Sequence, residues 1–191
     1  KPGCIGAGTG ALSGGIKGGL GTASLILDSG ITVAALVANN SICSVINPDS
    51  GRPWEIQLEI DNEFGAQGKR SVRLPPEPEA EPVKNTTIGV VATNAVLNVA
   101  QAQKVAQMAH DGMARAIRPA HTMFDGDALF CLATGKIELP ETPGTFISPW
   151  AKCLNDLGHA AANCVSRAII HTVLSARSLA DMTAFCDLED K

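Results

Sequence analysis

Apolar residues recur with a helical period in two stretches of the chain. The first stripe consists of Val99, Ala102, Ala106, Ala109, Met113 and Ala116. Its spacings of three and four place all six on one helix face. Asn98 and Gln101 form a capping box at its start, and Pro119 ends it. A second helix is predicted to begin with Ser148 as its cap and Pro149 in first position. Its stripe consists of Leu154, Leu157, Ala161, Cys164, Ala168 and Thr172.

Short β-like runs precede the helices. Three of them are Thr22–Asp28, Ile31–Ala38 and Ser41–Ile46, and Ser29-Gly30 between the first two is a tight hairpin signal. Residues 1–24 are rich in glycine, which argues against regular structure there because glycine costs backbone entropy.

A segment rich in proline and glutamate, residues 71–85, predicts an exposed, extended linker. It ends at Thr86–Thr93, a β-branched run that predicts a buried strand. Another strand is expected at Asp127–Thr134. Strands, linker, strand, helix, strand and helix follow one another, which predicts a layered α/β fold.

Composition narrows the class of protein. With 191 residues, 45% hydrophobic and 18% charged, the chain suits one globular domain. The apolar residues are mostly small and aromatics make up only 4%, which favours closely packed helix and sheet layers. A net charge of −4 without a run of Lys or Arg argues against nucleic acid as a partner. No apolar stretch reaches the roughly 18–20 residues of a membrane span, so we expect no membrane partner.

The cysteines favour a cytoplasmic protein with free, buried thiols. They are Cys4, Cys43, Cys131, Cys153, Cys164 and Cys186, and none lies in a C-x-x-C pair. Their spacing does not suit zinc, and we expect neither metal nor cofactor. The chain begins at Lys1-Pro2 without an initiator methionine, so a targeting segment cannot be judged from it.

Two weaker motifs suggest a nucleotide site and a metal site. Residues 6–11 match the dinucleotide fingerprint G-x-G-x-x-A, and Asp28 follows at a suitable distance. That fingerprint needs a preceding strand and a following helix, and the glycines after it disfavour a helix. His121, Asp125 and Asp127 could begin a metal shell but do not complete one, and a solvated acidic turn fits them equally well.

The junction at Thr86 is more informative. A linker that runs directly into a threonine at the head of a strand suits a chain that cuts itself at Asn85–Thr86. The cut would give Thr86 a free α-amine, whose ordinary pKa of about 7.7–8 lets it act as base at working pH. This is the N-terminal threonine device for nucleophilic catalysis. The alternative is a linker followed by an ordinary strand.

Several blocks in the right order resemble the self-processing aminopeptidases. The blocks are residues 14–24, 37–40, 85–93, 109–119 and 121–130. That family includes L-aminopeptidase/D-Ala-esterase-amidases, β-peptidyl aminopeptidases and nylon-oligomer (6-aminohexanoate-oligomer) hydrolases. The resemblance runs from about residue 3 to about residue 175.

The resemblance implies a four-layer αββα fold similar to that of N-terminal-nucleophile hydrolases. It implies that residues 1–85 are the C-terminal part of an α subunit, that residues 86–191 are the β subunit, and that both belong to one structural domain. The N-terminal part of that domain would then be missing from this chain. It also implies a homo-oligomer of αβ units.

Site residues carry over from the resemblance one by one. Thr86 matches the nucleophile. Lys17 matches a lysine whose charge would lower the pKa of the Thr86 amine. Asn39 matches the oxyanion donor, an interaction worth roughly 2.7–4 kcal/mol. Asp125 and Asp127 match the acidic pair that orients the new N-terminus. That pair is Ser and Glu in serine-type members, so two aspartates with threonine look closer to the nylon-oligomer branch.

The expected function is therefore hydrolysis of short peptides or amino-acid amides through an acyl-enzyme on Thr86. Three alternatives stay open at this stage. They are hydrolysis of 6-aminohexanoate oligomers, acyl transfer of the ornithine acetyltransferase kind, and a non-catalytic family-like fold used for binding or assembly.

Overall fold

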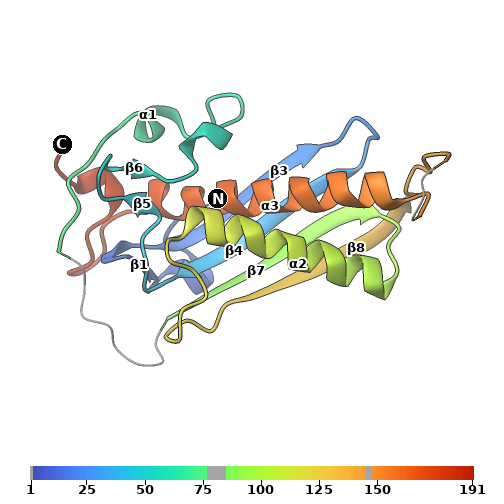
Figure 1. The fold of residues 1–191 in the computed structure, drawn as a ribbon. Coiled ribbons are helices and arrows are strands. Elements are labelled where there is room, and N and C mark those ends of the chain that lie inside the picture. Colours follow the sequence, from blue (N-terminus) through green and yellow to red (C-terminus); the bar gives the residue numbers. More distant parts are fainter. Residues whose placement is uncertain (1, 77–84, 145–147) are drawn as a thin grey trace.

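The computed structural model describes residues 2–76, 85–144 and 148–191 (Figure 1). Most of the expected linker, residues 77–84, lies outside the described residues. The short strands are β1 (Leu12–Ser13), β2 (Ile16–Lys17), β5 (Ile46–Asn47) and β6 (Arg52–Pro53), and α1 (Gly65–Gly68) is a single turn. The long elements are β3 (Gly19–Ile26), β4 (Thr32–Asn40), β7 (Thr86–Ala95), α2 (Val99–Ala116), β8 (Ala128–Ile137) and α3 (Ala151–Leu174).

A four-stranded sheet in the order β3-β4-β7-β8 forms the centre of the fold. The first three strands are antiparallel, whereas β7 and β8 are parallel because α2 connects them as a crossover. Helices α2 and α3 lie side by side along the sheet (Figure 1). The register pairs Asn40 with Thr86 and Asn39 with Thr87, so the start of β7 lies beside the end of β4.

The predicted capping box of α2 is confirmed. Gln101 N donates to Asn98 Oδ1, and Asn98 N donates to Gln101 Oε1, both at 2.9 Å. The helix ends at Ala116, before Pro119. Three members of its predicted apolar stripe are buried, namely Ala109, Met113 and Ala116. Ala102 and Ala106 are half-buried, and Val99 in the first turn is 86% exposed, so the prediction was wrong at Val99.

The start of α3 differs from the prediction. The helix begins at Ala151, because Ser148 and Pro149 form a turn that precedes it. In that turn Ala151 N donates to Ser148 O at 3.1 Å and Trp150 N donates to Ser148 Oγ at 3.4 Å. The predicted stripe is otherwise confirmed, with Leu157, Ala161, Cys164, Ala168 and Thr172 all buried.

Glycine has a different role from the one expected near the N-terminus. Strand β3 begins at Gly19, within the region that glycine content argued against. A Cβ at Gly21 would lie 2.0 Å from Ala168 O, so the strand backbone rests directly on α3. A Cβ at Gly112 of α2 would likewise lie 2.0 Å from Ala162 O. These glycines are packing residues that allow the layers to approach closely.

The hairpin predicted at Ser29-Gly30 is confirmed, but the strand predicted at Ser41–Ile46 is wrong. The hairpin closes with Leu27 N donating to Ile31 O at 2.9 Å. Within Ser41–Ile46, only Ile46 joins a strand, in the short pair β5–β6. Ser41 Oγ instead donates to Cys43 O at 2.8 Å, a local bond of the kind that competes with a sheet ladder.

Strand β7 is buried on one face only, which corrects the expectation of a buried strand. Thr87, Gly89 and Val91 face the helices. On the opposite face the apolar side chains are substantially exposed, namely Leu36 (44%), Ile88 (51%), Phe130 (63%) and Leu132 (56%). The described residues therefore provide one sheet and one helix layer of the expected αββα arrangement. An open apolar sheet face is where a further layer packs in layered folds.

A buried charge cluster joins the two parts of the chain on either side of the linker. Arg167 on α3 contacts Glu63 through Nε–Oε1 at 2.5 Å and Nη2–Oε2 at 2.8 Å. His171 Nε2 lies 3.1 Å from Glu63 Oε2, and Arg167 Nη1 donates to Ser24 O at 3.0 Å. Burial alone would raise the pKa of Glu63, but the hydrogen bonds from Arg167 and His171 hold that pKa below its ordinary value.

This cluster gives a stability prediction with a defined pH dependence. Glu63→Gln should lower the free energy of unfolding by about 3–5 kcal/mol at about pH 7, because it leaves the buried Arg167 charge uncompensated. Since the folded pKa of Glu63 is depressed, its contribution is present above the unfolded pKa and is lost as the pH falls through the folded pKa. The difference between wild type and variant should therefore shrink at about pH 3.

Urea unfolding followed by circular dichroism, at one protein concentration and both pH values, measures this difference. Asp156→Asn is the matched control, because its ion pair with Lys152 is exposed on both sides and should contribute little to stability. An equal loss for Glu63→Gln at both pH values would contradict the assignment.

Candidate active site

The Asn85–Thr86 peptide bond lies at the start of β7, between β4 and the segment that leads into β8. Thr86 Oγ1 donates to Asn85 O at 2.5 Å, which places the hydroxyl directly against the carbonyl of the bond expected to be cut. Gly126 N donates to the same carbonyl oxygen at 3.1 Å. Asn85 also forms a parallel bridge with Asp125. The bond is thus held by the residues that precede β8.

Asp127 fixes the first residues of β7. Its Oδ1 accepts from Thr87 N at 2.9 Å, one residue beyond the candidate nucleophile. Its Oδ2 accepts from His121 N at 3.2 Å and lies 2.9 Å from His121 Nδ1. The Asp127 side chain is only 5% exposed, so these contacts are sheltered from water. This carboxylate therefore holds the backbone of the residue next to Thr86.

Asp125 lies on the other side of Gly126 and has its own donors. Its Oδ1 accepts from Ile42 N at 3.2 Å, and its Oδ2 accepts from Thr122 Oγ1 at 2.6 Å. Both carboxylates are therefore engaged by N–H and O–H groups, as in a hydrogen-bonded acidic turn. Among the residues that the structure describes, no group of three or more His, Cys, Asp or Glu side chains is placed to hold a metal ion.

Lys17 is fully buried next to the glycine-rich segment. Its Nζ donates to the carbonyl oxygens of Ala11 at 2.7 Å, Gly8 at 3.2 Å and Gly18 at 3.4 Å. Burial lowers the pKa of this ammonium. Three carbonyl acceptors match the three hydrogens of a charged lysine. Residues 6–11, two of which accept hydrogen bonds from Lys17, lead into β1 and not into a helix. They therefore lack the structure that the dinucleotide fingerprint requires.

Asn39 faces the core. Its Nδ2 donates to Ser13 Oγ at 3.1 Å and to Thr172 Oγ1 at 3.0 Å, which uses both amide hydrogens. Its Oδ1 accepts from Ser41 N and from Thr87 Oγ1. The side chain is fully buried among these groups. In this arrangement Asn39 ties β4 to α3 and to β7, and its amide points away from the face that carries Thr86.

Asn40 was not among the residues that the sequence singled out. It is paired with Thr86 across the β4–β7 ladder, and side chains of such partners lie on the same face of a sheet. Its Oδ1 accepts from Leu12 N at 3.0 Å, which orients the carboxamide. A hollow of about 290 Å³ opens beside this pair, lined by Ala7, Gly10, Ala11, Ala38, Asn40, Thr86 and Ile88. Lys17 supports one wall of it through Ala11.

A larger hollow of about 490 Å³ lies next to Asp125. Its lining includes Ile42 and Thr122, the two residues that donate to that carboxylate, together with apolar Trp54 and Phe124. Arg118 stacks over the Trp54 ring with its guanidinium 4.5 Å from the ring centroid, and its charge is paired with Glu55 at 2.9 Å. The candidate site therefore has an apolar neighbour.

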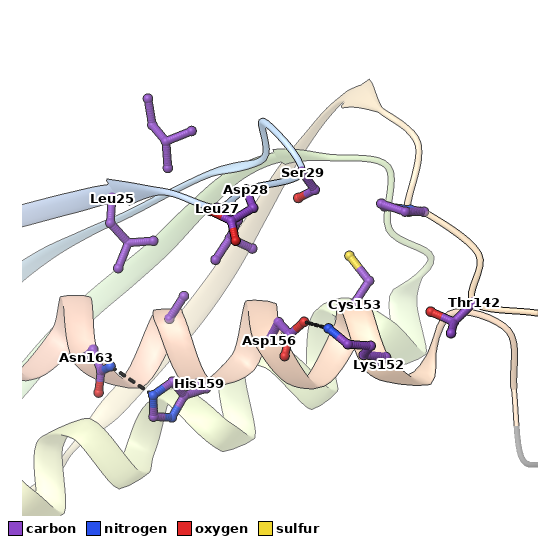
Figure 2. A pocket seen from close by; sticks show the side chains of 13 residues that line it. Leu25, Leu27, Asp28, Ser29, Thr142, Lys152, Cys153, Asp156, His159 and Asn163 are labelled. Carbon is purple, nitrogen blue, oxygen red and sulfur yellow. Dashed lines mark hydrogen bonds and ion pairs between the residues drawn. The ribbon is translucent and has the colours of Figure 1, made fainter. Parts of the chain in front are cut away.

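Another hollow, of about 540 Å³, lies at the opposite end of the sheet (Figure 2). It is formed by the β3–β4 turn and the first turns of α3, where Lys152 pairs with Asp156 at 2.8 Å and Asn163 contacts His159 at 3.1 Å. The ladder runs from the Ile26–Thr32 pair beside this hollow to the Gly19–Asn39 pair at the other end. This hollow is thus remote from Thr86.

The family model of Peptidase family S58 matches residues 1–184. An uncharacterized aminopeptidase of Mycobacterium leprae is 42% identical over 198 residues, covering 97% of this chain and 52% of that protein. A 6-aminohexanoate-oligomer endohydrolase of Paenarthrobacter ureafaciens is 39% identical over 82 residues, or 43% of this chain and 22% of that protein. The chain spans about half the length of the curated aminopeptidases it matches.

Two solved structures share the fold. A Burkholderia sp. β-aminopeptidase superposes with a TM-score of 0.65 at 27% identity, covering 95% of this chain and 49% of that one. The L-aminopeptidase D-Ala-esterase/amidase of Ochrobactrum anthropi, described as a variant of the Ntn hydrolase fold, gives 0.66 at 23% identity, covering 95% and 47%. The predicted α/β class, with its likeness to N-terminal-nucleophile hydrolases, is confirmed.

Proposed function

The chain belongs to peptidase family S58, and on that premise we propose that it carries the nucleophile of a self-processing amide hydrolase, Thr86. The observation that supports the proposal most directly is the 2.5 Å contact between Thr86 Oγ1 and the carbonyl oxygen of Asn85. Family membership alone leaves the nucleophile open, and this contact supports Thr86 as the nucleophile and Asn85–Thr86 as the bond that is cut.

In the proposed reaction, self-cleavage turns Thr86 into an N-terminal residue. Its α-amine then accepts the hydroxyl proton while Oγ1 attacks the carbonyl of a substrate amide. The amine returns the proton to the leaving amine, and water releases the acyl group from Thr86. Residues 1–85 and 86–191 stay together as the two subunits of one domain, held by the β4–β7 ladder and the Glu63–Arg167 pair.

The supporting residues receive separate roles. Asp127, with Asp125, positions the new N-terminus. Lys17 supports the wall of the hollow beside Thr86, and its charge favours the free-base form of the amine. We assign the oxyanion donor of substrate hydrolysis to Asn40 in place of Asn39. Asn40 shares the hollow with Thr86, whereas the Asn39 amide donates to Ser13 and Thr172.

The substrate class follows from the same group. We propose short peptides or amino-acid amides, in line with the aminopeptidase names of the relatives. A second candidate is a 6-aminohexanoate oligomer. It is favoured by the Thr86 and two-aspartate combination and by the apolar hollow at Trp54 and Phe124, which suits a polymethylene chain. Acyl transfer remains the third candidate, and an added amine acceptor would reveal it through a transfer product.

Further features of the proposal concern the whole protein. We propose a homo-oligomer of αβ units in the cytoplasm. The cytoplasmic assignment is supported by the six cysteines, none of which forms a disulfide bond in the part of the chain that the structure describes. Among the described residues, no helix combines the length and apolarity needed to cross a bilayer.

Intact-mass measurement of the purified full-length protein tests the proposal. We expect two chains that co-elute under native conditions, the smaller beginning at Thr86, and release of amine from alanyl anilides or 6-aminohexanoate oligomers. The ratio of the two rates assigns the substrate class. Protein that never yields a fragment beginning at Thr86 would rule out self-processing, and cut protein inactive on both substrates would rule out the hydrolase.

A further inference from the structure

Thr86 lies between two hydrogen-bond donors, one just before β8 and one at the end of β4. Gly126, just before β8, directs its N–H at the Asn85 carbonyl oxygen from 3.1 Å. Asn40 is on the other side, paired with Thr86 in the β4–β7 ladder and lining the hollow beside it. In the uncut chain, Gly126 N is the one of these two donors for which a hydrogen bond to the Asn85 carbonyl oxygen is observed.

Resting on the proposed function, we propose that self-cleavage and substrate hydrolysis use different oxyanion donors. The Gly126 N–H stabilises the oxyanion that forms on Asn85 during self-cleavage. The Asn40 side-chain amide does so for a substrate bound in the hollow. Gly126 is thus a catalytic residue for the step that creates the enzyme.

Self-cleavage consumes one water molecule and needs no other reagent. A bond forms between Thr86 Oγ1 and the carbonyl carbon of Asn85, and negative charge collects on the oxygen that faces Gly126 N. The bond from that carbon to Thr86 N then breaks, and the hydroxyl proton ends on this nitrogen, which becomes an amine. The resulting ester is hydrolysed by water to the Asn85 carboxylate and the free Thr86 hydroxyl. A backbone donor that is already in place costs no reorganisation at the moment of attack.

The absence of a side chain at position 126 fits this geometry. A Cβ there would lie 3.1 Å from Thr86 Oγ1, closer than most real Cβ contacts. Glycine therefore lets the backbone N–H approach the carbonyl without crowding the attacking hydroxyl. The flanking carboxylates hold the donor, because Asp125 is bound to Ile42 N and Thr122 Oγ1, and Asp127 to Thr87 N.

Removing one N–H tests the proposal without adding a side chain. Cell-free synthesis of the full chain with glycolic acid at position 126 replaces that N–H by an ester oxygen. We expect the rate at which the Thr86 fragment appears to fall by about 10²–10³-fold, the range for loss of one oxyanion donor. Mass spectrometry counts the cut molecules, so that hydrolysis can be expressed per cut molecule. Its fold-loss should be at least about ten times smaller than the fold-loss of self-cleavage.

Asn40→Ala should give the opposite ratio, with hydrolysis per cut molecule falling more than self-cleavage. Circular dichroism and thermal unfolding establish that each variant is folded before rates are compared. An unchanged self-cleavage rate in the glycolate variant overturns the role of Gly126. Equal losses of both rates in either variant overturn the division between the two donors. A wild-type protein that cuts itself but hydrolyses neither substrate refutes the proposed function and leaves the Gly126 result standing.

Discussion

Replacement of Thr86 by alanine should leave one uncut chain without amide hydrolase activity. The variant lacks the hydroxyl that contacts the Asn85 carbonyl, and without the cut it also lacks the free α-amine that would act as base. Loss of the nucleophile in serine hydrolases lowers kcat by about 10⁶-fold, and we expect a loss of that order here. Intact mass and initial rates on alanyl anilides measure the two effects.

Two further variants make this result specific. Thr86→Ser keeps a hydroxyl at the same position and should both cut itself and hydrolyse substrate. Thr93→Val removes a hydroxyl from the far end of the same strand, where Thr93 Oγ1 donates to Thr32 O, and should leave both rates near those of wild type. Full activity in Thr86→Ala would show that another residue is the nucleophile.

The helices could be predicted because their signals are local. A capping box needs only Asn98 and Gln101, and both sit within one turn of α2. The start of β7 was also within reach, since a linker and a β-branched run meet at Thr86. The glycines of β3 were misread because their reason is distant in sequence. Gly21 is required by the carbonyl of Ala168, on a helix more than a hundred residues later.

We propose Asn40 where the resemblance indicated Asn39, and the difference between the two residues has a physical cause in the sheet. Side chains alternate between faces along a strand, so the choice between Asn39 and Asn40 is a choice of face. In β4 both faces are apolar, because Val33 and Val37 face the helices and Leu36 lies on the open side. A two-sided apolar strand shows no alternation from which the face can be read. Only the pairing of Asn40 with Thr86 decides it.

Lys17 illustrates what a resemblance transfers and what it leaves out. A lysine near the nucleophile was expected to act by its charge. In the fold its three hydrogen bonds gather the backbone of the glycine-rich segment, which forms one wall of the hollow beside Thr86. Any effect of its removal would therefore combine the loss of charge with the loss of three buried hydrogen bonds.

Asp127→Asn should separate positioning from chemistry more clearly. The carboxylate accepts from Thr87 N on one oxygen and from His121 on the other. An asparagine of the same size accepts on one side only and presents an NH₂ group to a donor on the other. We expect self-cleavage and kcat to fall by about 10²–10³-fold with little change in KM, because the lost contact positions the nucleophile and does not bind substrate.

Asp111→Asn supplies the control, since it makes the same chemical change at an exposed position of α2. His121→Ala removes the ring contact to Asp127 and the ring packing on His110, but it leaves the His121 N–H donor to Asp127. Its effect should therefore be smaller than that of Asp127→Asn. Wild-type self-cleavage in Asp127→Asn would mean that the β4–β7 ladder alone holds Thr86. A rise in KM at constant kcat would instead show that Asp127 acts in substrate binding and not in positioning the nucleophile.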